Sequence, residues 1–489
     1  MAVEEIADVA STVTSDSKRR KRLGSRSRVS VPQSTRPMSV CQVAATNEGA
    51  TWMVEQLRDL RNRYGCVPTA VVEGETGSLI DKCRRENIPI HAHDFSFTAL
   101  PDLRRLPGSV IRLAKYFRRQ RFDVVQTHLF HSMVIGRTAA WLADVPVRLS
   151  MVASPFHLEA STPRWIDRAT CWMDTCIIGS CQYTVDLYKG LGIEDERLAL
   201  VYYGADERKF SADETEPARI REEFGWPEDT PLVVMVAYFY PPLPVSGWIP
   251  PHVQGRAIKG HEYVIQAAPA ILEKFPNAKI LLVGSGWGEA GTEYMQQMQA
   301  LVKEMNLEES VIFTGFRNDV NAILRAADVA IQASLCENLG GTIESLLMRC
   351  PTVATRAGGL VDTVIHEKTG LQAEPGDPVS LAQAVIRLLS DREYARQLAA
   401  AGEAWVLERF TLRRTVEDLA TLYERQLFKK NRRKKGYRLY VTLWRLLLLA
   451  PVAIYLTGRL AIQEYRVHER FTRNIGQFFG KLLPWRWLG

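Results

Sequence analysis

The sequence predicts an α/β protein with two Rossmann-like domains that face each other across a cleft. Short apolar runs alternate with helical patterns over residues 38–205, and the same alternation returns over residues 231–408. This alternation is typical of a parallel sheet with helices on both faces. The charged stretch between them, residues 206–230, contains Pro217 and Pro227, and we interpret it as an inter-domain linker. A length of 489 residues also exceeds that of one ordinary domain.

The N-terminal domain begins at Met38 with an apolar run that predicts a buried strand. Residues 50–63 then place Trp52, Val54 and Leu57 at helical spacing. Further strands and helices follow in alternation. The predicted strands span residues 40–45, 68–72, 122–126, 147–152, 176–179 and 198–201, and the later helices lie near 78–86 and 133–142. Because parallel sheets bind ligands outside the carboxyl ends of their strands, we expect a ligand at the loops that follow these strands.

The C-terminal domain repeats the pattern and contains one long irregular segment. Its predicted strands span residues 232–237, 278–283, 311–313, 329–332 and 352–354. Between the first two strands, residues 238–260 contain five prolines and are too long for a typical connection, which indicates a functional or mobile segment. The segment ends in Arg256 and Lys259, two cations just before a predicted helix start.

The two ends of the chain differ from the domains. Residues 1–37 are Ser-rich and charged, and they predict a disordered arm. Residues 429–489 join a basic run to an apolar one and predict a membrane-associated tail. Within the tail, residues 439–458 are apolar apart from Arg445 and a few polar side chains. An interfacial helix, a single span and a soluble helix packed on the body all fit this pattern.

The net charge of +7 comes mostly from two basic runs, one in the arm and one that opens the tail. A basic surface over the whole chain would indicate nucleic acid, whereas terminal clusters fit anionic lipid better. We therefore expect an anionic membrane surface as a partner of residues 429–489, and no nucleic acid. The eight cysteines have no metal-like spacing and the N-terminus has no apolar signal, which favours reduced thiols on the cytoplasmic face of the membrane.

Residues 334–347 form the most informative stretch of the sequence. A β-like run leads into Gly340 and Gly341, and an apolar helical pattern follows. Glycines at a strand-to-helix turn let backbone N–H groups approach an anion, and the N–H groups around Gly341 and Thr342 are placed for phosphate. Glu337 and Glu344 flank the turn, and Glu344 can accept a ribose diol. The combination predicts a nucleotide-sugar site.

This region resembles the donor site of the retaining glycosyltransferases of family 4, which have the GT-B fold. The matching parts are residues 334–340, 343–347, 351–354, 358–359, 366–371, 375–389 and a closing helix near 409–428, which in the family crosses back to the N-terminal domain. The resemblance covers about residues 38–428. One departure concerns the acids, because six residues separate Glu337 from Glu344 where the family has seven. Either the loop is one residue shorter, or Cys336 fills the position of the first acid.

The resemblance implies roles for further residues. Arg256 and Lys259 match the cations that bind the diphosphate in the family, although Ala237 stands where an arginine usually follows the first strand. His157 matches the histidine near the donor sugar, and His128 is the competing candidate. The remaining donor-binding positions are Gly284 in the loop near the nucleotide, Phe316 at the base and Gly49 in the first turn of the N-terminal domain.

The implied reaction moves a sugar from a UDP- or GDP-linked donor to a glycan or lipid-linked acceptor of cell-envelope polysaccharide or glycolipid synthesis, with retention of configuration. Glu337, His157 and Lys259 are the candidate catalytic residues. The nucleotide sugar is a substrate, so we expect no cofactor. The sequence contains no D-x-D motif, so we expect no metal at the diphosphate. Two alternatives stay open, namely a nucleotide-sugar epimerase or hydrolase of the same fold and a non-catalytic membrane scaffold.

Overall fold

A computed structural model describes residues 36–97 and 100–431. Both sheets lie within one compact unit that begins at Ser39. Residues 1–35 of the predicted arm and residues 432–489 of the predicted membrane-associated tail lie outside the described residues. Among the helices that are described, none is both long enough and apolar enough to cross a membrane.

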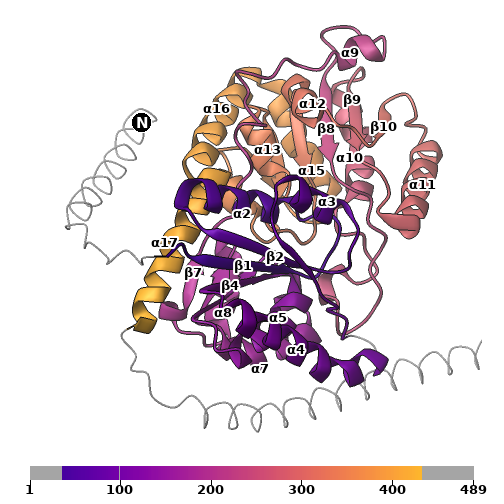
Figure 1. Cartoon of the computed structure of the whole chain (residues 1–489). Coiled ribbons are helices and arrows are strands. Elements are labelled where there is room, and N and C mark those ends of the chain that lie inside the picture. Colours follow the sequence, from indigo (N-terminus) through magenta and orange to yellow (C-terminus); the bar gives the residue numbers. More distant parts are fainter. Residues whose placement is uncertain (1–35, 98–99, 432–489) are drawn as a thin grey trace, which may run out of the picture. The chain divides into compact units, whose positions relative to one another are not determined.

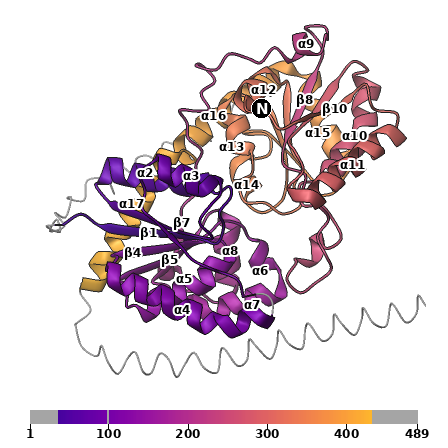
Figure 2. The ribbon, with the colours of Figure 1, turned by 45° about the vertical axis from the view of Figure 1, so that its right-hand side comes forward.

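The N-terminal sheet has seven strands in the order β3-β2-β1-β4-β5-β6-β7, all parallel. The strands are β1 (Ser39–Ala44), β2 (Val67–Val72), β3 (Ile90–Ala92), β4 (Val124–His128), β5 (Val147–Val152), β6 (Cys176–Gly179) and β7 (Leu198–Leu200). The helices are α2 (Thr51–Tyr64), α3 (Ser78–Arg85), α4 (Leu100–Gln120), α5 (Phe130–Leu142), α6 (Phe156–Glu159), α7 (Ser161–Thr170) and α8 (Gln182–Gly190). Figures 1 and 2 show α2 and α3 on one face of the sheet and α4, α5 and α7 on the other.

The C-terminal sheet has six strands in the order β10-β9-β8-β11-β12-β13, again all parallel. They are β8 (Leu232–Val236), β9 (Lys279–Val283), β10 (Val311–Gly315), β11 (Val329–Gln332), β12 (Thr352–Thr355) and β13 (Leu371–Ala373). The helices are α9 (Ile220–Glu223), α10 (His261–Lys274), α11 (Gly288–Glu304), α12 (Val320–Ala326), α13 (Thr342–Leu347), α14 (Leu360–Thr363), α15 (Pro378–Ser390), α16 (Arg392–Arg409) and α17 (Leu412–Asn431). The strand order reverses at β8, so the loops after β8 and β11 lie next to each other, where such sheets bind ligands.

The structure confirms two parallel-sheet Rossmann-like domains and adds elements that the sequence pattern did not predict. The edge strands β3 and β13 have three residues each, too few to leave a clear apolar pattern. Helix α4 was missed because Pro107 lies inside it and has no N–H for the helical ladder. Leu113 and Phe117 of α4 are buried in the core of this domain, which offsets the lost hydrogen bond.

The later part of the charged stretch 206–230, which we interpreted as a linker, packs against the C-terminal sheet. The Ile220 side chain is fully buried beside β8 and β9 residues. The Arg221 guanidinium forms an ion pair with Asp328 at 2.7 Å. This part is therefore fixed to the domain that follows it, whereas Lys209 near the start of the stretch pairs with Glu55 of α2 at 2.6 Å.

Helix α17 returns the chain to the N-terminal domain, at the place where the resemblance implied a crossover helix. It packs on α2 and β5. The Tyr423 hydroxyl donates to Gln126 Oε1 at 2.6 Å, and the Thr415 hydroxyl donates to the Tyr202 carbonyl at 2.7 Å.

Candidate functional site

The loop between β11 and α13 holds Glu337 in an ion pair with Lys259. The Lys259 ammonium donates to Glu337 Oε2. Glu337 also accepts from the Ser334 hydroxyl at 3.3 Å and from the Asn338 N–H at 3.1 Å. Desolvation lowers the pKa of Lys259, but the adjacent Glu337 carboxylate outweighs it, so the pKa lies above its usual value. Lys259 is therefore a fixed positive charge at this loop.

Gly260 brings Lys259 against the loop. Its φ of +74° lies in the left-handed region. A Cβ added there would overlap the carbonyl oxygen of Ala333. Only glycine combines this φ with so close an approach. The Ile258 carbonyl accepts from the Leu335 N–H at 2.8 Å, which joins the two segments a second time.

Glu344 lies in α13 and presents an unpartnered oxygen. Among the described residues, no group forms a hydrogen bond with its buried Oε2. Burial raises the pKa of Glu344 to about 7, and the Glu337 carboxylate adds to the shift. A buried polar atom without a partner is uncommon in native structures. This oxygen is therefore suited to accept a hydrogen bond from a ligand.

The glycine turn differs in detail from the phosphate site that the sequence predicts. The Gly341 N–H donates to Gln332 Oε1 at 3.2 Å. The Thr342 hydroxyl is buried and bonds to the Leu339 carbonyl and to Thr363 Oγ1. A phosphate that binds the Gly341 N–H therefore has to displace the Gln332 side chain. Gly340, at φ +54°, provides the bend that leads into α13.

The other predicted donor-binding residues lie on separate loops. The exposed Arg256 guanidinium donates to the Tyr263 hydroxyl at 3.0 Å and to the His252 carbonyl at 3.4 Å. The resemblance implied that Arg256 binds the diphosphate together with Lys259, whereas in the structure the two cations have different partners. Phe316 follows β10 and is 59% exposed. A Cβ at Gly284 would overlap the Ala237 carbonyl oxygen, which explains the glycine after β9.

Gly49 follows β1 in the N-terminal domain. Its N–H donates to Ser78 Oγ at 3.2 Å, and its φ is +62°. The neighbouring Glu48 carboxylate accepts from the Ser78 N–H at 3.1 Å. The turn that contains Gly49 is thus held to the start of α3.

The structure separates the two histidine candidates. His128 is fully buried and bonds to the Tyr203 hydroxyl at 2.6 Å and to Gln42 Oε1 at 3.2 Å, which is a structural network. His157 lies in α6, and its Nε2 has no hydrogen-bond partner within the described residues although Asp167 Oδ2 is 3.9 Å away. Burial lowers the pKa of His157 to about 4, and Asp167 offsets only part of that shift. His157 is therefore neutral at pH 7.

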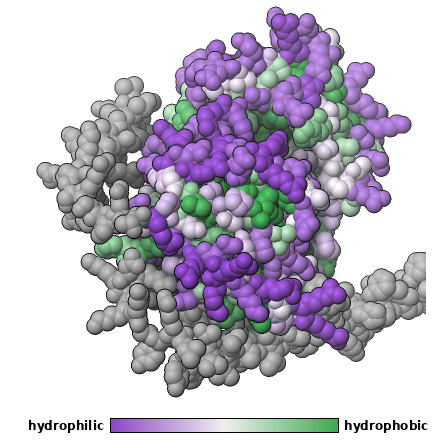
Figure 3. Space-filling model, viewed as in Figure 1, coloured by the Kyte–Doolittle hydropathy of each residue, from purple (hydrophilic) through white to green (hydrophobic). Residues whose placement is uncertain are grey.

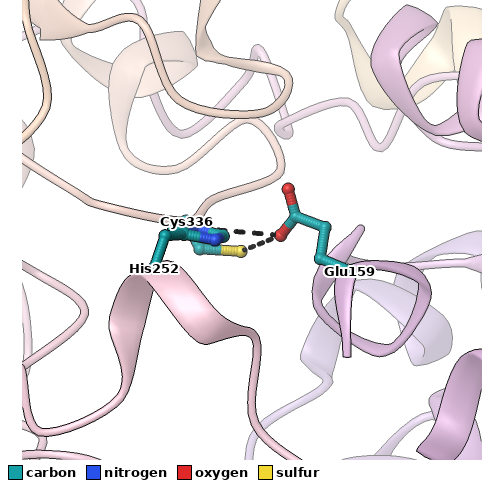
Figure 4. A group of neighbouring side chains, drawn as sticks. All are labelled: Glu159, His252 and Cys336. Atoms are coloured by element: carbon teal, nitrogen blue, oxygen red, sulfur yellow. Dashed lines mark hydrogen bonds and ion pairs between the residues drawn. The ribbon is translucent and has the colours of Figure 1, made fainter. Parts of the chain in front are cut away.

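Four residues meet beside Glu337, and of these the sequence pointed only to Cys336, as the alternative occupant of the first acid's position. The Cys336 thiol donates to Glu159 Oε2 at 3.2 Å, and His252 Nε2 lies 3.9 Å from the same oxygen (Figure 4). The Tyr183 hydroxyl donates to Glu159 Oε1 at 2.8 Å. Burial raises the pKa of the Cys336 thiol well above its usual value, which keeps it protonated. These residues come from α6, α8, residues 238–260 and the loop between β11 and α13, so no local spacing in the sequence could reveal that they meet.

This group joins the two domains next to the site. Glu159 belongs to the N-terminal domain, whereas Cys336 belongs to the C-terminal domain. A second contact between the domains lies nearby, where the Ser180 hydroxyl donates to Asn338 Oδ1 at 3.1 Å. The donor atoms of Glu159, His252 and Cys336 lie within 4.8 Å of one another, close enough to hold a metal ion. The two neighbours of Glu337, Cys336 and Asn338, thus both contact the other domain.

Comparison with known proteins identifies both domains. Residues 254–405 match the family model of the glycosyl transferases group 1, and residues 48–204 match the glycosyl transferase 4-like domain. Together these ranges contain all the predicted site residues, from Gly49 to Glu344.

The chain is also similar to individual proteins. It is 27% identical over 347 residues to the 2-deoxystreptamine glucosyltransferase of Streptomyces kanamyceticus, which covers 66% of this chain and 83% of that protein. It is 24% identical over 295 residues to an Escherichia coli UDP-Gal:alpha-D-GlcNAc-diphosphoundecaprenol alpha-1,3-galactosyltransferase, which covers 58% of this chain and 70% of the relative. The crystal structure of Anabaena HepE in complex with UDP has a similar fold, with a TM-score of 0.66, 19% identity, and coverage of 79% of this chain and 99% of that one.

Proposed function

Since the chain is a GT-B glycosyltransferase of the family 4 type, we propose that it moves a sugar from a UDP- or GDP-linked donor to a glycan or lipid-linked acceptor and retains the anomeric configuration. The single observation that carries the donor assignment is the unpartnered, buried Oε2 of Glu344. The two hydroxyl groups of a ribose diol can donate hydrogen bonds to this carboxylate. Glu337, on the loop that precedes α13, forms the ion pair with Lys259.

Lys259 supplies positive charge where the leaving nucleoside diphosphate develops negative charge. In this proposal the diphosphate replaces part of the contact that Lys259 makes with Glu337. Fixed positive charge in a partly desolvated site stabilises a developing anion without reorganisation. Lys259 performs this task without a metal ion.

Glu337 and His157 act on the sugar side of the site. Glu337 holds Lys259 in position and has a second oxygen that bonds to the Asn338 N–H. A neutral His157 can donate or accept a hydrogen bond at the donor sugar, but its low pKa makes it a poor carrier of positive charge. We therefore assign His157 to sugar positioning and not to acid catalysis. Attack from the same face as the leaving phosphate then retains the configuration.

The acceptor proposal rests on two observations. The E. coli relative is named for a diphosphoundecaprenol-linked acceptor, and the tail, residues 429–489, has a basic and apolar composition. A lipid-linked acceptor in cell-envelope polysaccharide or glycolipid synthesis fits both. The protein would then work at the cytoplasmic face of the membrane, peripherally or through a single C-terminal span.

A donor panel tests the proposal. Nucleoside diphosphate release is measured with UDP- and GDP-linked sugars, with and without a polyprenyl-diphosphate glycan in membrane lipid. Acceptor-dependent release with one base is the expected result, and NMR of the product then gives the anomeric configuration. Release without any acceptor identifies a hydrolase, and turnover of none of the donors contradicts the proposal.

A further inference from the structure

Helix α4 has an exposed face that is strongly basic. We define the basic face by six side chains of this helix, all exposed: Arg104, Arg105, Arg112, Lys115, Arg118 and Arg119. In the view of Figure 3, the surface over α4 is coloured hydrophilic. The opposite side of the helix, with Leu113 and Phe117, is buried in the core. The helix is therefore amphipathic with cations on its solvent side.

These cations have no ion-pair partner among the residues that the structure describes. Arg118 donates to the Leu142 carbonyl at 2.7 Å, and the Asp94 carboxylate interacts electrostatically with Arg105 without forming an ion pair. Two exposed arginines of the C-terminal domain are paired instead, Arg356 with Glu374 and Arg387 with Glu367. The basic face thus has a positive field that the neighbouring carboxylates leave largely uncancelled.

Helix α7 and the turn that follows it, Cys171–Met173, add cations and aromatic rings on the same side of the sheet. Arg164 and Arg168 are exposed, and Trp165 and Trp172 are 49% and 43% exposed. The acid of α7, Asp167, points inward and pairs with the buried Arg137 at 2.6 Å. Both α4 and α7 pack on α5, since Val110, Trp141 and Ile166 from the three helices share one buried cluster. Figures 1 and 2 show α4, α5 and α7 on the same side of the sheet.

We propose that the basic face, together with Trp165 and Trp172, docks on an anionic lipid bilayer. Cations attract the headgroups, and tryptophan is enriched at the depth where headgroups meet the acyl chains. Charge argues against the chain's own tail as the segment that covers the basic face: its first seven residues, 429–435, include six cations, which the cations of this face repel. Single-stranded nucleic acid would need stacking platforms along a groove, and here one ring lies on α7 and the other on the turn that follows it.

Docking in this way would orient the enzyme. The N-terminal domain, which contains α4 and α7, would face the bilayer, and the C-terminal domain would face away from it. This orientation would bring the enzyme to a lipid-linked acceptor, and that consequence rests on the proposed function. The docking itself does not, since it can be measured without any donor or acceptor.

Vesicle flotation of the full chain tests the proposal. The probe is a phosphatidylglycerol vesicle, with a phosphatidylcholine vesicle as the neutral reference. The test variant is Arg112→Gln with Lys115→Gln and Arg119→Gln, and glutamine keeps helix propensity at exposed positions. The control variant, Lys274→Gln with Lys303→Gln and Arg392→Gln, removes the same charge from exposed positions of α10, α11 and α16. A tail variant replaces the cations of residues 429–435 by glutamine.

Each cation near an anionic surface strengthens partitioning into the vesicle by roughly fivefold, and the expected loss of vesicle binding follows from this factor. The test variant should partition on the order of 100-fold more weakly into phosphatidylglycerol vesicles, whereas the control variant should change about fivefold at most. Trp165→Ala with Trp172→Ala should weaken binding independently of charge. Equal losses in the test and control variants, a loss confined to the tail variant, or a loss of single-stranded RNA binding with vesicle binding intact would each overturn the proposal.

Discussion

The Lys259 ammonium and the Glu337 carboxylate form an ion pair that joins the turn before α10 to the loop after β11. The Tyr240 ring lies 5.9 Å from the Lys259 nitrogen, and both charged side chains are largely buried. The pair fixes a positive charge on the loop that leads to Glu344. Its disruption should therefore affect the chemistry more than the fold.

Replacing Lys259 by alanine should lower kcat/KM by about 10²–10³-fold, because it removes charge stabilisation of the leaving diphosphate. Lys274→Ala is the matched control, since Lys274 is an exposed cation at the other end of α10. Steady-state release of nucleoside diphosphate measures both variants. An equal activity of the two would remove Lys259 from the donor site.

A left-handed φ costs any alanine about 1–2 kcal/mol, and Gly260→Ala should lower the free energy of unfolding by more than this amount. The added methyl group also meets the Ala333 carbonyl. Gly255→Ala is the control, because Gly255 has almost the same φ, +73° against +74°, but no atom within 4 Å of the added Cβ. Chemical denaturation gives both free energies of unfolding. Equal losses in the free energy of unfolding would contradict the close approach of Gly260 to the loop between β11 and α13.

The raised pKa of Glu344 should appear in the pH dependence of stability. Its pKa lies at about 7 in the folded protein, against an ordinary value of 4.5 for a glutamate, so the folded state binds more protons between these values. The free energy of unfolding then falls as pH rises through this window, by about 2–3 kcal/mol between pH 5 and 8. Glu344→Gln should lack this component. Identical pH profiles of wild type and variant would contradict the assignment.

His157 should stay neutral down to about pH 5, because burial lowers the pKa of its imidazole to about 4. Its ring resonances in a labelled sample should not titrate between pH 6 and 8, and His157→Gln assigns them. A titration near pH 6.5 would mean that the ring is solvated. It would also reopen a role for His157 as an acid.

Much of the fold could be predicted because apolar strands and turn glycines follow local rules. The glycine turn with Glu337 and Glu344 was recognisable for the same reason, since all its residues lie within one short stretch. The hydrogen bond from the Gly341 N–H to Gln332 could not be predicted, because it depends on how the end of β11 lies against the turn.

The rest of the site depends on contacts between distant segments. Glu159, His252 and Cys336 are far apart in the sequence and meet only because the domains touch there. Arg256 and Lys259 look like a pair in the sequence, yet they have separate partners in the structure. His128 and His157 likewise could not be ranked from sequence, because burial and bonding partners distinguish them.

The central claim is that a nucleoside diphosphate binds between Glu344 and Lys259. Titration calorimetry of UDP and GDP against the wild type, Glu344→Gln and Lys259→Ala tests it most directly. We expect one of the two nucleotides to bind the wild type with 1:1 stoichiometry and to bind each variant at least about tenfold more weakly, which is the loss of one good hydrogen bond or charge contact. Unchanged affinity in both variants, or no binding of either nucleotide to the wild type, would contradict the account.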